Sequence, residues 1–297
     1  MEQQTSGRRF FIVTLLNVII TFFELVGGLL SGSLALLSDA FHNFGDAFSV
    51  ILSYVANKIG KRSPNSSNTY GYRRIEILTA LLNSVLLIGV SIFLLIEAVR
   101  RLLHPQNVAG GIMFWVAVIS FLANTLATLL LNHDSKHNLN IRATYLHLLS
   151  DALASIGVII SAGLIFFFKA NWIDPLMTLL VSGYIIYESL PIVRQTFVIL
   201  MEGAPKIDFD AVEQDLLQIP AIKGVHHCHA WQIDENQIVV SLHLNLEDLP
   251  LSQTEKIYTQ VEQILKTKYQ IAHVTIQAEC DRGKGEKLFL TNQTDHQ

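Results

Sequence analysis

Residues 34–57 read LALLSDAFHNFGDAFSVILSYVAN, a largely apolar stretch long enough to cross a bilayer as a helix, yet it contains ionisable side chains. Within it, Asp46 follows His42 by four residues, which places both side chains on one helix face, one turn apart. A second apolar stretch repeats this spacing with His147 and Asp151. Ionisable groups at bilayer depth are costly and usually functional. The two pairs therefore indicate both the fold class and a candidate site.

The composition of the 297-residue chain is typical of a membrane protein. Hydrophobic residues make up 51% of the chain and charged residues 15%, whereas a soluble protein carries about 25% charge. Six stretches have the roughly 20 apolar residues that a helical span needs. They are residues 10–30, 34–57, 77–99, 112–131, 139–168 and 173–200. We therefore predict an α-helical membrane protein with six transmembrane helices.

Positive charge near the predicted spans indicates their orientation, because cytoplasmic loops are enriched in lysine and arginine. One side carries Arg8, Arg9, Lys58, Lys61, Arg62, Arg73, Arg74, Lys136, Arg142, Arg194 and Lys206, and the other carries Arg100, Arg101 and Lys169. We therefore expect both termini to lie in the cytoplasm. The expected location is the cell membrane, as a multi-pass protein of a prokaryotic inner or plasma membrane.

The sequence after about residue 205 is typical of a small soluble domain. Its periodicity predicts a helix, two strands, a helix and a strand at 208–218, 225–233, 237–246, 252–268 and 272–279. A hairpin turn is expected at 234–236, and Ser252 with Glu255 has capping-box spacing at the start of the second helix. The αββαβ order predicts a small cytoplasmic α+β domain with both helices on one face of the sheet.

We therefore expect a cytoplasmic segment at 1–9, a six-helix transmembrane domain at 10–204, the α+β domain at 205–280 and a disordered tail at 281–297. Residues 201–297 hold 8 Lys/Arg and 15 Asp/Glu. This acidic balance and the lack of a basic patch make nucleic acid an unsuitable partner. Two cysteines are too few for a disulfide framework and fit a reducing compartment.

Two facing helices with these His and Asp pairs would offer two imidazoles and two carboxylates, a four-coordinate set suited to Zn²⁺. The depths agree: Asp46 lies about 18 Å from the outer edge of a roughly 30 Å core, and His147 about 12 Å from the inner edge. Two other interpretations remain open. The quartet could hold two helices together by neutral hydrogen bonds, or it could relay protons without a metal.

The chain resembles the cation diffusion facilitator family, and within it the zinc-transporting branch. The resemblance rests on SLALLSDAFHNFGD at 33–46, the His147/Asp151 pair, GYRRIE at 71–76, WIDP at 172–175 and LMEG at 200–203. It covers residues from about 10 to 280, nearly the whole chain. It implies a homodimeric exporter that exchanges metal for protons, with a transport site between the second and fifth spans.

The resemblance also assigns individual residues. It implies a transport site formed by His42, Asp46, His147 and Asp151, and a ferredoxin-like or copper-chaperone-like cytoplasmic domain that binds regulatory metal. The ligands implied for that domain are His226, His243, His273 and Glu279, with His227, His229, Cys228 and Cys280 as further candidates. Arg74 and Glu202 occupy the places of a charge pair between the membrane and cytoplasmic domains. In place of a long His-rich loop, the loop before the fifth span has only His133 and His137.

Zinc binds neutral imidazole and ionised carboxylate, so metal and protons compete for the same atoms. We therefore expect a metal/proton antiporter that works by alternating access, with Zn²⁺ and protons as its partners and no resident cofactor. One alternative is a transporter mainly for Co²⁺, Cd²⁺, Fe²⁺ or Mn²⁺. Another is a membrane metal sensor. An intramembrane metalloprotease is disfavoured, because the sequence has no HExxH motif and four protein ligands leave no position for catalytic water. Asp39 has no assigned role.

Overall fold

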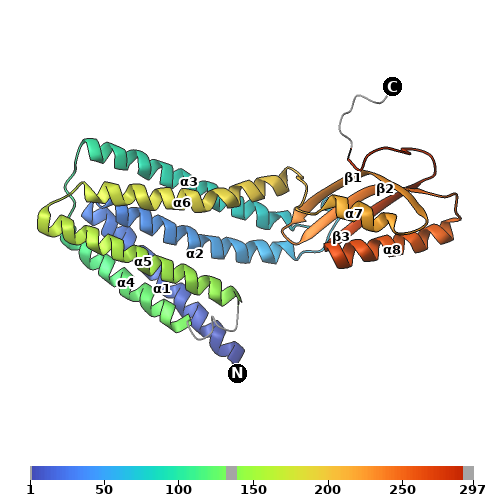
Figure 1. Ribbon diagram of the computed structural model, residues 1–297. Coiled ribbons are helices and arrows are strands. Elements are labelled where there is room, and N and C mark those ends of the chain that lie inside the picture. Colours follow the sequence, from blue (N-terminus) through green and yellow to red (C-terminus); the bar gives the residue numbers. More distant parts are fainter. Residues whose placement is uncertain (1, 132–138, 290–297) are drawn as a thin grey trace. The chain divides into compact units, whose positions relative to one another are not determined.

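The computed structural model describes residues 2–131 and 139–289 of the chain, and the side chains of residues 13, 15–130 and 145–289. The chain forms two compact units. The first comprises residues 1–55 and 79–193, and the second comprises residues 56–78 and 194–297. In the described part of the chain, six long helices are followed by a small sheet with two shorter helices. Figure 1 shows this order along the chain.

The six long helices follow the predicted apolar stretches. They are α1 (Glu2–Ser31), α2 (Leu34–Gly60), α3 (Arg74–Leu103), α4 (Gly110–Leu131), α5 (Leu139–Phe168) and α6 (Ile173–Leu200). A helix satisfies its own backbone hydrogen bonds, which is why apolar segments of this length adopt it in lipid. Six of the twelve helix ends coincide with the predicted bounds, and the other six extend beyond them because the helices continue past the apolar part of the sequence.

Within the described residues, four helices (α3 to α6) are long and apolar enough to cross a membrane. The apolar part of α1 is shorter and covers Leu15–Ser31. α2 falls short of this composition because it carries the polar segment from Asp39 to Asp46. The helix that differs most from a simple membrane span is therefore the one that contains the first His/Asp pair.

Small residues allow the helices to approach closely. A methyl group built on Gly27 of α1 would lie 2.6 Å from a methyl carbon of Val116 on α4, and one on Gly45 of α2 would lie 2.5 Å from a methyl carbon of Leu87 on α3. Both distances are shorter than carbon atoms tolerate. These contacts agree with the use of small residues at helix interfaces in membranes.

The start of α2 is held by a side chain of α6. Asp174, which is fully buried, accepts hydrogen bonds from the hydroxyl of Ser33 at 2.5 Å and from the backbone N–H groups of Leu34 at 2.8 Å and Ala35 at 3.2 Å. These N–H groups have no partner within the helix, and a carboxylate at this position is also favoured by the helix dipole. Nearby, Arg101 donates to the carbonyl of Gly32. Together these bonds close this end of the bundle.

The second unit contains α7 (Phe209–Leu217), β1 (Ile222–Asp234), β2 (Gln237–Leu246), α8 (Leu251–Tyr269) and β3 (Ile271–Glu279). The strand order is β1-β2-β3, with β1 antiparallel and β3 parallel to β2. Apolar residues of both helices and of the sheet form one core, which includes Leu216, Val261, Leu242 and Leu244. The predicted αββαβ fold is confirmed.

Two local expectations differ from the structure. α8 begins after Pro250 and no side chain caps it, so the predicted capping box of Ser252 and Glu255 does not form. Residues 281–289, by contrast with the expected disordered tail, pack against the second unit. Leu288 lies in the core, and its carbonyl accepts a hydrogen bond from the N–H of Cys228 at 2.8 Å. A buried leucine and a strand-edge bond hold this segment in place.

Candidate metal centre

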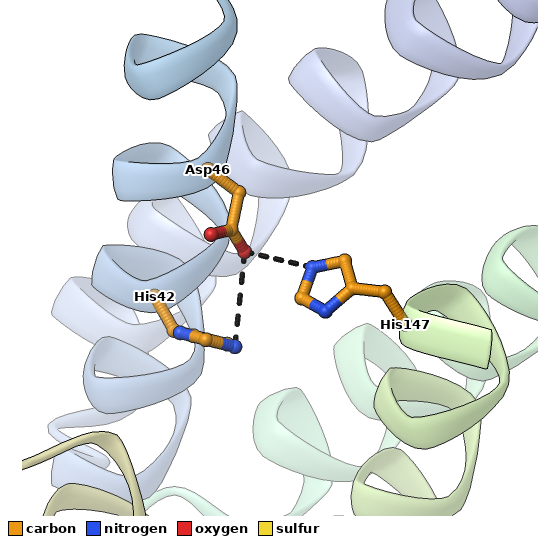
Figure 2. A group of neighbouring side chains, drawn as sticks. All are labelled: His42, Asp46 and His147. Carbon is orange, nitrogen blue, oxygen red and sulfur yellow. Dashed lines mark hydrogen bonds and ion pairs between the residues drawn. The ribbon is translucent and has the colours of Figure 1, made fainter. Parts of the chain in front are cut away.

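The structure brings His42 and Asp46 of α2 together with His147 of α5. The Nε2 atom of His147 lies 3.0 Å from the Oδ2 atom of Asp46, and the Nε2 atom of His42 lies 3.7 Å from the same oxygen. Figure 2 shows both imidazoles directed toward this carboxylate from two different helices. The four-residue spacing on α2 places His42 and Asp46 on the face that meets α5.

Asp151 lies one turn after His147 on α5. Its Oδ2 atom is 3.6 Å from the Nε2 atom of His147, its side chain is 7% exposed, and this oxygen accepts no hydrogen bond. A buried carboxylate oxygen without a donor is costly and calls for a partner. Asp151 thus stands beside the three closer residues as a fourth potential ligand.

The distances suit a tetrahedral metal ion. Zinc bound by imidazole nitrogen and carboxylate oxygen at about 2.0–2.1 Å has ligand atoms separated by about 3.3 Å. Three nitrogen–oxygen distances lie near this value: 3.0 Å for His147 to Asp46, 3.7 Å for His42 to Asp46 and 3.6 Å for His147 to Asp151. The ligand atoms of His42, Asp46 and His147 all lie within 4.8 Å of one another, whereas Asp151 lies outside this group and would have to move closer to join an ion bound there. The donor set of two imidazoles and two carboxylates suits zinc and other late first-row divalent ions.

A cavity of about 650 Å³ gives access to these residues. Besides His42, Asp46 and His147, its lining includes Asn17 of α1, Ser53 of α2, Asn83 of α3 and Glu188 of α6. The lining therefore extends toward the end of the bundle where α2 and α6 end, opposite the end closed by Asp174. The side chains of Asp46 and His147 are 29% and 35% exposed, so the site is accessible from this cavity.

A second group of potential ligands lies on the sheet. His226 of β1 pairs directly with His243 of β2, and Glu279 of β3 is level with Asn245, two residues from His243. His243 lies between Leu242 and Leu244 in the strand, so it faces the side of the sheet opposite the helical layer. A β-bulge between His226 and His229 inserts one residue into β1 and re-aims the side chains around it.

The imidazoles of His226 and His243 converge on the carboxylate of Glu279. The Nε2 atom of His226 is 3.0 Å from its Oε2 atom, and the Nδ1 atom of His243 is 3.2 Å from its Oε1 atom. Burial lowers the pKa of His243, and the neighbouring imidazoles add to this effect while Glu279 opposes it. Burial raises the pKa of Glu279, but hydrogen bonding from Gln277 and the two histidines outweigh it, so the pKa is lowered overall. A neutral imidazole and an ionised carboxylate are the forms that bind metal.

Among the other candidates in this unit, His273 and Cys228 lie apart from the group, whereas His227 contacts one of its members. His273, at the opposite end of β3 from Glu279, is exposed and its ring contacts Tyr70. Cys228 points into the apolar core, where burial raises the pKa of its thiol to about 11. His227, with a positive φ of 49°, stacks on His243 at 4.5 Å between ring centroids.

His229 contacts His227, with ring centroids 4.9 Å apart, while Cys280 is exposed. His133 and His137 lie outside the described residues.

The Arg74/Glu202 pair predicted by resemblance forms within the second unit. The Nη2 atom of Arg74 lies 3.3 Å from the Oε1 atom of Glu202, and both side chains are largely exposed, at 38% and 64%. A second pair joins Arg73 to Asp234 at 3.4 Å, with only 11% of the Asp234 side chain exposed. Sequence analysis did not identify this pair, because nothing in the sequence relates the loop before α3 to the end of β1.

Comparison with known proteins identifies the class. Residues 10–201 match the family described as the cation efflux transmembrane domain, and residues 204–280 match the cation efflux protein, cytoplasmic domain. The first match spans more than half of the chain, so the protein belongs to the cation efflux family and is a multi-pass membrane protein.

Several relatives are similar over most of their length. The zinc transporter ZitB of Pectobacterium atrosepticum is 36% identical over 92% of this chain and 85% of its own. The cadmium, cobalt and zinc/H(+)-K(+) antiporter of Bacillus velezensis is 37% identical over 92% and 88%. The metal cation efflux system protein CzcD of Cupriavidus metallidurans is 34% identical over 90% and 85%.

Proposed function

We propose that the protein exports divalent metal cations, with Zn²⁺ as its main substrate, in exchange for protons. The observation that carries this proposal is the convergence of His42, Asp46 and His147 from two membrane helices at the head of a cavity. The names of the relatives support the substrate, since they include zinc transporters and a cadmium, cobalt and zinc/H(+)-K(+) antiporter.

The transport site in this proposal consists of His42, Asp46, His147 and Asp151. Two imidazoles and two carboxylates complete a tetrahedral Zn²⁺ shell and leave no position for a catalytic water, which favours a carrier over a hydrolytic enzyme. The same atoms bind protons when the metal leaves, because metal ligands must be deprotonated. Imidazole titrates near pH 6.5, so a more acidic outer medium promotes release of the metal.

Transport requires the site to face each side of the membrane in turn. The cavity leads from the site toward the end of the bundle where α2 and α6 end, and the positive residues near that end favour a cytoplasmic orientation. The opposite end is closed by Asp174 and the start of α2. The conformation described is thus the inward-facing one. Outward release then requires the bonds around Asp174 to open while the cavity closes.

The second unit acts in this proposal as a cytoplasmic metal-binding domain, with His226, His243 and Glu279 as ligands. Both termini lie in the cytoplasm, and the protein works as a homodimer in the cell membrane. The match of residues 204–280 to the cytoplasmic domain of cation efflux proteins supports the location of this unit. Metal at this site regulates transport rather than being transported, since the site lies outside the membrane helices.

Zinc flux into proteoliposomes with an imposed pH gradient tests the proposal. Asp46→Asn and His147→Ala are expected to abolish zinc flux and the accompanying proton movement. Asp281→Asn and His104→Ala are the matched controls, because both residues are exposed and lie outside the site. Wild-type flux in either site variant would refute the proposed site, and zinc flux without proton movement in the wild type would refute antiport.

A further inference from the structure

Basic side chains gather where α2 ends and α3 begins. Residues 56–78, which belong to the second unit, hold five Lys/Arg and one Glu, whereas residues 201–297 hold 8 Lys/Arg and 15 Asp/Glu. All five basic residues lie within five residues of the apolar stretches at 34–57 and 77–99. They are Lys58, Lys61, Arg62, Arg73 and Arg74.

The end of α2 and the start of α3 are in direct contact, so these charges belong to one surface. A methyl group built on Gly60 would lie 3.4 Å from the Oε1 atom of Glu76 and 3.9 Å from the Cα atom of Arg73. In the loop between the helices, a methyl group built on Gly71 would lie 3.6 Å from the carbonyl oxygen of Arg62. These contacts bring the basic residues of both helix ends together.

Three of the five basic side chains have no acidic partner. The two arginines at the start of α3 pair with acidic residues at 3.4 and 3.3 Å. In the described part of the chain, by contrast, no ion pair includes Lys58, Lys61 or Arg62, and all three side chains are exposed. Glu76, the one acidic residue of the segment, accepts a hydrogen bond from the amide of Asn57. Three positive charges are therefore available to an anion.

One face of α2 changes in character toward these charges. Ile51 and Tyr54 are 59% and 72% exposed. Lys58 and Lys61 follow on the same face, at spacings of four and three residues. The N–H of Lys61 bonds to the carbonyl of Asn57 at 3.1 Å, so the helical spacing continues to this residue. An aliphatic side chain, then a tyrosine, then lysines is the order expected where a helix passes from the hydrocarbon through the headgroups.

We propose that Lys58, Lys61 and Arg62 bind the phosphate group of an anionic phospholipid. Lysine and arginine donate charge-assisted hydrogen bonds to phosphate oxygens, and basic clusters next to a membrane helix attract anionic lipids. A phospholipid also supplies acyl chains that cover the exposed Ile51 and Tyr54, which a soluble anion or an acidic protein surface does not. This inference does not depend on the transport site.

Lipid binding to the full-length protein in uncharged detergent micelles tests the proposal. Phosphatidylglycerol or phosphatidylcholine with a pyrene group on one acyl chain is titrated in, and energy transfer from tryptophan reports binding. One basic residue near a headgroup is worth about fivefold in affinity, so Lys61→Gln/Arg62→Gln should bind phosphatidylglycerol about 25-fold more weakly. Its affinity for phosphatidylcholine should not change. Lys256→Gln/Lys266→Gln on α8 is the matched control, because it removes the same charge from two exposed residues.

Wild-type affinity for phosphatidylglycerol in Lys61→Gln/Arg62→Gln would overturn the proposal, and so would an equal loss in the control. Displacement of the lipid by an equal concentration of glycerol phosphate would identify a site for soluble anions and refute a lipid site. A lower molecular mass of the variant in light scattering would assign the charges to contact between two copies of the chain, which also refutes it. If the variant fails to fold, the wild type decides: about 0.5 M salt should remove its preference for phosphatidylglycerol, and a preference that persists would refute the proposal.

Discussion

Replacing Asp174 tests the closure of the bundle at the start of α2. The carboxylate accepts three hydrogen bonds, from Ser33, Leu34 and Ala35, and the residue is fully buried. Each hydrogen bond to a charged group contributes about 1.5 kcal/mol at the lower end of the usual range, so removal of all three costs about 4.5 kcal/mol. Loss of a buried charge returns part of this free energy, which leaves a net destabilisation of about 3 kcal/mol for Asp174→Ala.

Asp174→Asn separates charge from hydrogen bonding. Its amide has one acceptor oxygen where the carboxylate uses two, and its NH₂ group then faces a donor, so we expect a loss of about 2 kcal/mol, smaller than that of the alanine variant. Denaturant titration in mixed micelles, followed by the fluorescence of nearby Trp172, measures the free energy of unfolding. Asp281→Ala is the control, because that side chain is 91% exposed. Equal stability of the alanine variant and the wild type would refute the view that this carboxylate holds α2 in place.

Three further predictions concern the second unit. Hydrogen bonds from two side chains of α8 lower the pKa of Asp215. The stability that the ionised Asp215 contributes is therefore fully present above the pKa of the unfolded chain, about 3.9, and is lost as the pH falls through the folded pKa. Asp215→Asn should therefore speed amide exchange in α7 at pH 7 and have no effect at strongly acidic pH. Gly283→Ala should weaken metal binding by the sheet, because its methyl group would collide with the Nε2 atom of His226 and its φ is +66°. Isothermal titration would detect the loss, and wild-type affinity would contradict it. Cys280 is exposed and should react with maleimide at pH 7, whereas Cys228, which is buried with a pKa of about 11, should not. Labelling of both cysteines would contradict the position of Cys228 in the core.

The membrane helices and the candidate transport site could largely be predicted from the sequence. The lengths of the apolar stretches predict the six helices. The four-residue spacing of His42 and Asp46 places both side chains on the same helix face, whatever the rotation of the helix within the bundle. The depth argument placed His147 at the level of Asp46, and in the structure these two side chains are 3.0 Å apart. Helical periodicity and span length are local properties, so they can be read without knowledge of the tertiary contacts.

The features that sequence analysis missed depend on long-range pairing. The role of Asp174 as a partner of α2 joins residues about 140 positions apart. Convergence of His226, His243 and Glu279, but not His273, follows from strand register and a bulge, which no local pattern determines.

X-ray absorption spectroscopy of the zinc-loaded protein would identify the ligands of the transported ion. In a His243→Ala variant, whose cytoplasmic site is weakened, we expect four nitrogen and oxygen ligands at about 2.0–2.1 Å, with the multiple-scattering pattern of two imidazoles. His147→Ala should reduce this to one imidazole or abolish binding. A six-coordinate oxygen shell, or a spectrum unchanged by His147→Ala, would contradict the claim that α2 and α5 bind the transported ion between them.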